Sequence, residues 1–417
     1  MAFAAYILLA LEGLFALWLL WREGLLESPR ALIVSALLTL AAFGLRGYCL
    51  PYETMDYQNF LSKWVEFYRN NLGFHSISYP LGNYNIPYLY FLCFFSYLPI
   101  RDLYLIKLLS IFFDVLLAFA SMELLALCTG DKRLRLTCFF TVLLLPTVVL
   151  NGSVWGQCDS IYVALALLGL WCGLRDRPVL SVLFFALSFG FKLQAVFLMP
   201  IMAVLWFRGS YKLWHFALFP AFYVLLVLPA VALGKPFVET LTLYASQTDS
   251  IGTGLNYNSP SIYAIFWRAP ETKDVINLGI VGAFTFMFTL LIFCWLRRDR
   301  LTDRAVLAAA LLFAAGIPFF LPHMHDRYFF GADILSVVLG CACVLCIPAA
   351  LLMQYASLLS YHAYLKMRFL LYVNHGARAV AGVLALGIVQ LLHDTAAKKE
   401  KFPDFEKSSL TKDENLL

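Results

Sequence analysis

Runs of about 20 apolar residues recur along this chain, and they constrain its fold more than any other feature. A backbone surrounded by hydrocarbon must satisfy its own hydrogen bonds, so such runs cross a bilayer as helices. The chain has 417 residues, 62% hydrophobic and 14% charged, whereas soluble proteins carry about 25% charged residues. The sequence therefore predicts an all-α polytopic membrane protein.

Short basic loops orient these apolar runs. Because Lys and Arg accumulate in cytoplasmic loops, we place the basic loops inside, which puts the N-terminus outside and the C-terminus inside. All the basic loops can lie on the inside only if the short apolar stretch Ile86–Ile100 does not cross the membrane. This stretch, with a proline near each end, is expected to lie along the membrane interface as a juxtamembrane helix. About thirteen spans are then expected, at 3–21, 31–49, 105–127, 136–153, 160–174, 178–191, 193–207, 213–232, 275–296, 304–321, 330–346, 348–365 and 378–393.

One transmembrane domain is expected over residues 1–395, followed by a polar cytoplasmic tail at 396–417. The longest interruption, residues 50–103, is predicted to be an extracytoplasmic loop, and long ordered loops are usually functional. Three more polar stretches, 151–160, 234–274 and 322–328, fall on the same side, together with Lys192 in a tight turn. This one-sided convergence predicts an active site at the outer face.

Asp56, in the first loop, is the candidate general base. A carboxylate at the mouth of an apolar cavity can take a proton from an acceptor hydroxyl. The alternative is that Asp56 caps a short helix, and Glu53 is the nearest competing acid. Asp159 likewise either lines the site or caps the next span, and Trp155 either stacks on a sugar or lies in the interfacial aromatic belt.

Arg327, Lys192 and His325 are the candidate phosphate ligands. Ionisable groups near span ends are costly and usually functional, and a guanidinium binds phosphate through two donors. The alternatives are a rim ion pair between Arg327 and Asp326 and a snorkelling Lys192. Asn258, in a long loop, is a candidate for binding sugar hydroxyls.

The remaining composition argues against several other classes of site. The formal charge of +5 is small, and nothing indicates nucleic acid binding. The ten cysteines form no CxxC pair and no zinc-ligand spacing. A divalent cation between two carboxylates stays an alternative, but without an Asp-x-Asp cluster we favour a site with no metal and no cofactor.

Several motifs together are similar to those of GT-C fold glycosyltransferases. The first loop carries Asp56, Phe60 and Trp64, then Asn85-Ile-Pro-Tyr88. Val154-Trp-Gly-Gln-Cys-Asp159-Ser160, Phe191-Lys192-Leu-Gln194 and His323-Met-His325-Asp-Arg327-Tyr328 resemble more narrowly the bacterial integral-membrane mannosyltransferases related to GPI mannosyltransferase II. The chain departs from the pattern at Asn83-Tyr-Asn-Ile-Pro87, where an acidic motif is expected, and in its additional span 3–21.

The resemblance implies a polyprenyl-phosphate sugar donor, inversion at the anomeric carbon and an acid of the first loop as base, a role it carries to Asp56. We expect transfer of a hexose, mannose or glucose, to a hydroxyl of a glycan or glycolipid at the outer face of a bacterial cytoplasmic membrane, or in the endoplasmic reticulum lumen if the source is eukaryotic. The alternatives are a transporter or flippase and a polysaccharide ligase for lipid-linked sugars. The predicted sugar- and acceptor-binding residues are Trp155, Gln157, Asp159, Asn85, Tyr88, Asn258 and Gln194.

Overall fold

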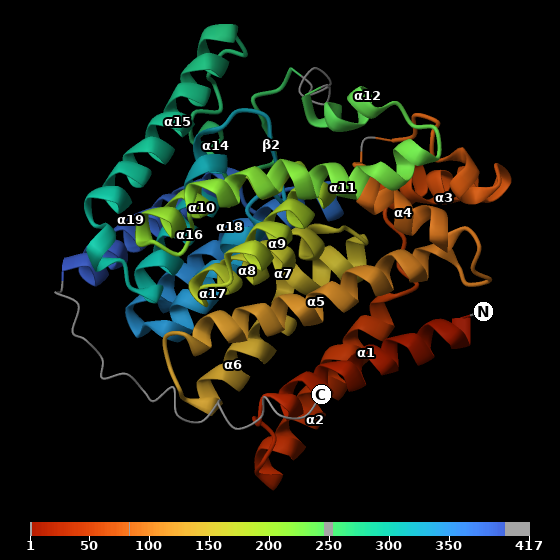
Figure 1. Cartoon of the computed structure of the whole chain (residues 1–417), viewed down its shortest axis with the longest axis horizontal. Coiled ribbons are helices and arrows are strands. Elements are labelled where there is room, and N and C mark those ends of the chain that lie inside the picture. Colours follow the sequence, from red (N-terminus) through yellow and green to blue (C-terminus); the bar gives the residue numbers. More distant parts are fainter. Residues whose placement is uncertain (1, 83, 246–252, 397–417) are drawn as a thin grey trace.

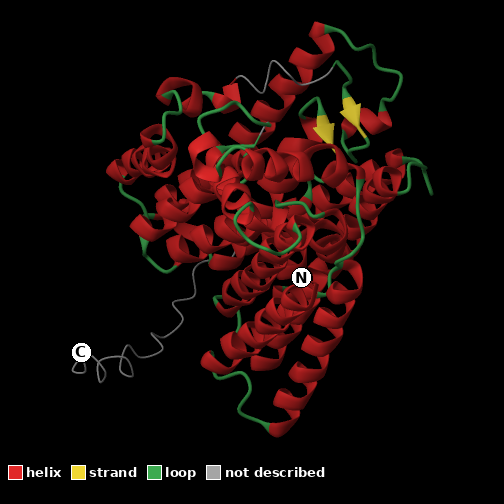
Figure 2. Ribbon diagram, turned by 90° about the vertical axis from the view of Figure 1, so that its right-hand side faces the viewer, coloured by secondary structure: helices red, strands yellow, loops and turns green. Residues whose placement is uncertain are grey.

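The computed structural model describes residues 2–82, 84–245 and 253–396, and these are almost entirely helical (Figure 2). The only paired strands of these ranges are β1 (Asn256–Tyr257) and β2 (Met324–His325), which pair in parallel. The predicted all-α class is therefore confirmed. The predicted tail lies outside the described residues from position 397 onward.

Within the described ranges, nine helical runs are long and apolar enough to cross a membrane. Some of them join a helix to a short 3-10 or π-helical turn (η). They consist of α1 (Ala2–Arg22), α2 (Pro29–Cys49), α5 (Asp102–Ala126), α6 (Lys132–Leu143) with α7 (Pro146–Val148) and η3 (Val149–Trp155), η5 (Leu213–Ala217) with α11 (Leu218–Ala232), α15 (Lys273–Leu296), α16 (Asp303–Phe320), η7 (Val344–Cys346) with α18 (Ile347–Leu365), and α19 (Val373–Ala396).

The other four predicted spans coincide with shorter apolar helices. These are α8 (Asp159–Leu174), α9 (Pro178–Phe191), η4 (Leu193–Phe197) with α10 (Pro200–Arg208), and α17 (Phe330–Ala342). Each of the thirteen predicted spans therefore falls on a helix. Figure 1 shows them as one bundle, with α15 along its edge.

The stretch Ile86–Ile100 forms α4 (Ile86–Phe95), whose ten residues reach about 15 Å, half of a hydrocarbon core of about 30 Å. It is thus too short to cross a membrane alone. It is not an exposed surface helix either, because seven of its ten residues are buried. The rest of the first loop contains η1 (Tyr57–Leu61), α3 (Ser62–Asn70) and η2 (Gly73–Ser76), and α4 packs against α3, α9 and α11.

The basic loops gather at one end of the bundle, which we call the basic end. Ion pairs join these loops to one another and to neighbouring helix ends: Arg135–Glu123, Arg135–Glu23, Lys132–Glu27, Arg208–Asp303 and Arg304–Asp394. Helix α5 runs from this end, at Glu123, to the first loop, where the Lys107 ammonium donates to the carbonyls of Cys49, Leu50 and Tyr52. The predicted charge asymmetry is therefore present between the two ends of the helices.

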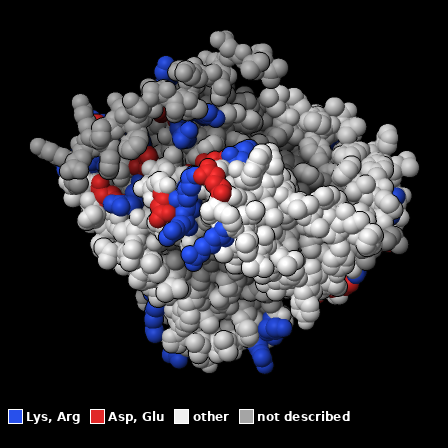
Figure 3. All heavy atoms as spheres, turned by 90° about the horizontal axis from the view of Figure 1, so that it is seen from below, with Lys and Arg blue, Asp and Glu red and all other residues white. Residues whose placement is uncertain are grey.

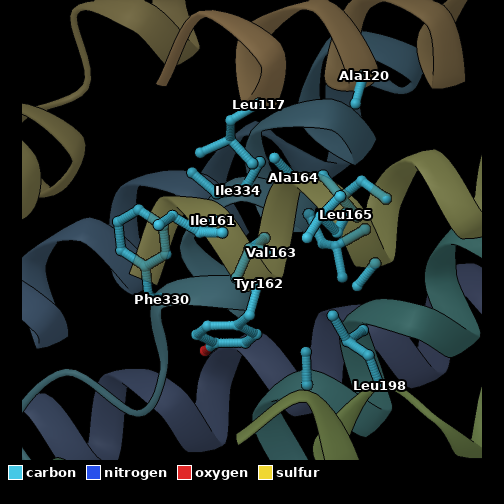
Figure 4. Packing of buried hydrophobic residues seen from close by; sticks show 14 of the residues in the cluster. Leu117, Ala120, Ile161, Tyr162, Val163, Ala164, Leu165, Leu198, Phe330 and Ile334 are labelled. Carbon is cyan, nitrogen blue, oxygen red and sulfur yellow. The ribbon is translucent and has the colours of Figure 1, made fainter. Parts of the chain in front are cut away.

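Many large apolar side chains of the helices are exposed. The face in Figure 3 is largely uncharged, with Lys, Arg, Asp and Glu in a few groups. Helix α15 is the least embedded span, and only 11% of its apolar window is buried. Figure 4 shows the opposite case, where Leu117 of α5, Ile161 of α8 and Ile334 of α17 meet in the core.

A buried ion pair fixes α2 to this core. The Arg46 guanidinium donates to Asp114 at 3.0 Å and to the Leu143 carbonyl at 2.8 Å, and both charged side chains are fully buried. Asp114 also accepts from Ser160. Because α2 leads directly into the first loop, this pair helps to position that loop over the bundle.

Candidate active site

A cavity of about 850 Å³ opens at the end of the bundle opposite the basic end. The first loop, the turn before α8, the turn between α9 and α10, the β1–β2 pair and the end of α18 all contribute to its wall. Eight of the eleven predicted site residues line it: Asp56, Asn85, Gln157, Lys192, Gln194, Asn258, His325 and Arg327. Segments as far apart in sequence as residues 56 and 364 therefore meet at one site.

Asp56 is held by three side-chain donors. Its Oδ2 accepts from the Trp155 indole at 2.7 Å and from the Gln157 amide at 2.9 Å. Its Oδ1 accepts from the Tyr364 hydroxyl at 2.5 Å. The side chain is half-buried at the start of η1 and makes no side-chain cap bond, so the alternative of a helix cap does not describe it.

The π-helical segment η3 and the turn after it aim these donors. Gly156 follows η3 with φ 76°, a left-handed conformation that favours glycine. The turn is closed by the Gln157 N–H, which donates to the Asn151 carbonyl at 3.0 Å, and by Thr54, whose hydroxyl donates to the Trp155 carbonyl at 3.1 Å. Trp155 and Gln157 thus reach Asp56 from the same side.

Asp159 lies behind the cavity wall and binds two of the three predicted phosphate ligands, Lys192 and Arg327. Its Oδ1 pairs with the Lys192 ammonium, and its Oδ2 lies 3.3 Å from Nε of Arg327 and 2.7 Å from the amide of Asn151. The carboxylate is 1% exposed. One buried acid therefore holds two cations at the cavity surface, and the group of three keeps a net positive charge.

A single indole contacts both Asp56 and one of these cations, Arg327. The Arg327 guanidinium lies 5.0 Å from the centre of the Trp155 ring, while the edge of that ring donates to Asp56. Tyr364 also stacks on this indole, with the ring centres 4.4 Å apart. Trp155 has no exposed surface, so it supports the cavity from behind.

The β1–β2 pair brings His325 into the wall. Tyr257 is paired with His325 in register, and the two rings stack at 4.6 Å. Burial, followed by the nearby Arg327 and Lys192, lowers the pKa of His325 to about 4. The imidazole is therefore neutral at neutral pH and brings hydrogen-bonding capacity, not charge, to the cavity.

Asp326 faces the same cavity with little solvent around it. Burial raises its pKa to about 7, although Arg327 opposes the shift. The Asp326–Arg327 ion pair expected as an alternative is long, at 3.9 Å. Arg327 is bound more closely to Asp159.

Three predicted sugar-binding residues are not on the cavity surface. Trp155 and Asp159 lie behind it, and Tyr88, which is 1% exposed, packs against Tyr84 at 4.7 Å. Asn85 lines the cavity, but its amide already donates to the Tyr223 hydroxyl and its carbonyl caps α4. Glu53 pairs with Arg101 and Gln58 away from the cavity.

Several tyrosines that line the cavity were not among the predicted site residues, and two of them contact Asp56 or Gln157. Tyr364 contacts Asp56, and the Tyr84 hydroxyl donates to the side-chain oxygen Oε1 of Gln157 at 3.2 Å. Tyr364 ends an apolar span, where a tyrosine is ordinary in a membrane protein. Its distance of 308 residues from Asp56 left no local signal.

A metal-binding cluster is not found among the described residues, where no three His, Cys, Asp or Glu side chains come together. The site without a metal stays a prediction.

The comparison with protein families decides which class of enzyme this chain belongs to. The model of glycosyltransferase family 87 matches residues 83–322, more than half of the chain. The chain belongs to glycosyltransferase family 87. No curated protein and no solved structure matches it.

The residues of this glycosyltransferase's candidate site come partly from inside and partly from outside the segment that matches the family. Trp155, Gln157 and Lys192 lie inside the matched segment, whereas Asp56 and Tyr364 lie outside it, on either side in sequence. The candidate carboxylate thus comes from one flank of the family segment, and its closest hydroxyl donor comes from the other.

Proposed function

We propose that the protein is an inverting GT-C type glycosyltransferase that moves a hexose, mannose or glucose, from a polyprenyl phosphate to a hydroxyl of a glycan or glycolipid. Asp56 is the general base. The observation that carries this proposal is a fixed carboxylate on one wall of a cavity whose neighbouring wall holds two cations.

The hydrogen bonds of Asp56 indicate which oxygen takes the proton. A carboxylate oxygen accepts about two hydrogen bonds, and Oδ2 already accepts two, from Trp155 and Gln157. Oδ1 accepts one, from Tyr364, and keeps one lone pair free. The acceptor hydroxyl therefore donates to Oδ1, beside Tyr364.

Lys192 and Arg327 form the phosphate side of the cavity. Both are fixed by Asp159, so their positive charge is in place before the substrate binds. Preorganised charge of this kind stabilises a leaving group without reorganisation during the reaction. Neutral His325 adds a hydrogen bond to a phosphate oxygen or a sugar hydroxyl.

We expect a membrane-borne donor because the cavity lies at the end of a bundle of apolar helices. A polyprenyl chain resides in the bilayer and presents its phosphate at the membrane surface, at the level of these cations. The cavity end is the extracytoplasmic end, since the basic end faces the cytoplasm by the charge rule.

The reaction follows from these positions. As the acceptor oxygen attacks C1, its proton passes to Oδ1 of Asp56. The new bond forms on the face of the sugar opposite the C1–O bond to phosphate, which breaks and leaves polyprenyl phosphate beside Lys192 and Arg327. The configuration at C1 is therefore inverted.

The test is turnover of a panel of polyprenyl-phosphate hexoses by the purified protein, with the product lipid read by mass spectrometry. We expect one hexose to be transferred, with inversion, and Asp56→Asn to reduce turnover by at least about a thousandfold while donor binding is kept. Glu53→Gln is the matched control, because it neutralises an acid of the same loop that does not line the cavity.

Full activity of Asp56→Asn would refute the role of Asp56. Movement of the lipid-linked sugar across the membrane without cleavage of the sugar–phosphate bond would instead support a transporter or flippase. Transfer of a preassembled polysaccharide would support a ligase.

A further inference from the structure

A second large groove lies at the basic end, away from the proposed active site. It runs between α2 and α6, its volume is about 850 Å³, and its walls are mainly apolar. Val34 of α2 and Thr137 and Thr141 of α6 line it and are exposed. Because both helices belong to candidate membrane spans, the groove opens toward lipid.

The length of the groove matches one leaflet of a bilayer. On α2 it extends from Arg30 to Leu38, and on the other side from Arg133 to Pro146. At 1.5 Å per residue these stretches reach about 12 to 20 Å, and half of a hydrocarbon core is about 15 Å. An acyl chain of the leaflet at the basic end therefore fits along it.

The mouth of the groove is positively charged. Arg30 and Arg133 line it and are exposed, and among the described residues neither side chain has an ion-pair or hydrogen-bond partner. The one lining acid, Glu27, is paired with Lys132 at 2.8 Å. Two uncompensated guanidinium groups thus stand where a lipid headgroup would lie, and guanidinium binds phosphate through paired donors.

We infer that this groove is a binding site for an anionic glycerophospholipid of the membrane leaflet at the basic end. Arg30 and Arg133 bind the headgroup phosphate, and one acyl chain packs between α2 and α6. The bound lipid covers an apolar face of α2 that the described part of the chain leaves open. This site is independent of the sugar-transfer reaction.

The experiment is native mass spectrometry of the full chain in detergent, titrated with phosphatidylglycerol and with phosphatidylcholine of the same acyl chains. We expect the wild type to bind phosphatidylglycerol at least about tenfold more tightly than phosphatidylcholine, since two charge-assisted contacts are at stake. The double variant Arg30→Gln/Arg133→Gln should lose this preference. Arg177→Gln, which removes an exposed arginine of the same end outside the groove, should keep it.

A second variant tests the apolar part of the site with both arginines intact. Val34→Trp fills the groove and should weaken binding of both lipids severalfold. The inference is overturned if the wild type binds the two lipids equally, if the double variant binds phosphatidylglycerol like Arg177→Gln, or if Val34→Trp leaves lipid binding unchanged. Thermal unfolding of each variant without added lipid establishes that it is folded.

Discussion

The indole nitrogen of Trp155 lies 2.7 Å from Oδ2 of Asp56, so a side chain with no exposed surface orients a carboxylate that lines the cavity. The same ring lies under the Arg327 guanidinium. One buried aromatic residue therefore contacts both the proposed base and one of the proposed phosphate-binding cations, Arg327.

Tyr364→Phe should lower kcat about tenfold and leave the KM for the donor nearly unchanged. The substitution keeps the ring that stacks on Trp155 and removes only the hydroxyl that donates to Asp56. A hydrogen bond to a charged group contributes about 1.5–3 kcal/mol. Steady-state kinetics with a labelled polyprenyl-phosphate sugar measure the effect, and an unchanged kcat would argue against a positioning role for Tyr364.

Lys192→Met should raise the KM for the donor about tenfold, because the loss of one charge-assisted contact to phosphate costs at least about 1.4 kcal/mol. Asp159 keeps Arg327 and Asn151 as partners, which limits the structural damage. Lys63→Met, an exposed lysine on α3 that does not line the cavity, is the control. An increase in the KM for the acceptor alone would contradict the assignment of Lys192 to the phosphate.

Asp326→Asn should change how the midpoint of thermal unfolding, Tm, depends on pH. The pKa of Asp326 is raised to about 7 in the folded chain and is about 3.9 in an unfolded chain. Between these values the folded chain holds a proton that the unfolded chain has lost, so this group makes stability fall as pH rises through the window. Asparagine cannot ionise. The Tm of the variant minus that of the wild type should therefore increase from pH 5 to pH 8.

The opposite dependence of stability on pH is expected for His325, whose pKa is lowered to about 4. Its contribution to stability is present above pH 6.5 and is lost as pH falls toward 4, because the unfolded chain then binds the proton more readily. The Tm of His325→Asn minus that of the wild type should therefore increase as the pH falls from 6.5 toward 4. Parallel Tm curves for the wild type and both variants would contradict the environments described for these two residues.

Arg46→Met should destabilise the fold by about 3–5 kcal/mol, the cost of leaving one member of a buried pair alone. Asp114 would lose its guanidinium partner in the core between α2 and α5. Arg101→Gln, which breaks the exposed pair with Glu53, should cost about 0–1 kcal/mol. Thermal unfolding in detergent compares the two, and equal losses would argue against the buried pair as an anchor of α2.

The sequence by itself determined the class of the fold, the positions of the helices and the charge asymmetry between the two ends. Hydrophobicity and loop charge act on each segment separately, because the bilayer is the solvent for every span. The length of Ile86–Ile100 and the charge of the loops after it predict that this stretch does not cross the membrane, and its placement in the bilayer stays a prediction. Asp56 could be singled out from its place in the long loop.

Only the tertiary structure decided which polar groups meet. Asp159 was expected at the cavity surface but lies behind it and binds Lys192 and Arg327, and Tyr364 reaches Asp56 across 308 positions of sequence. Such contacts depend on how the helices pack and rotate against one another. That packing is set by the shapes of many buried side chains together, and no local run of residues encodes it.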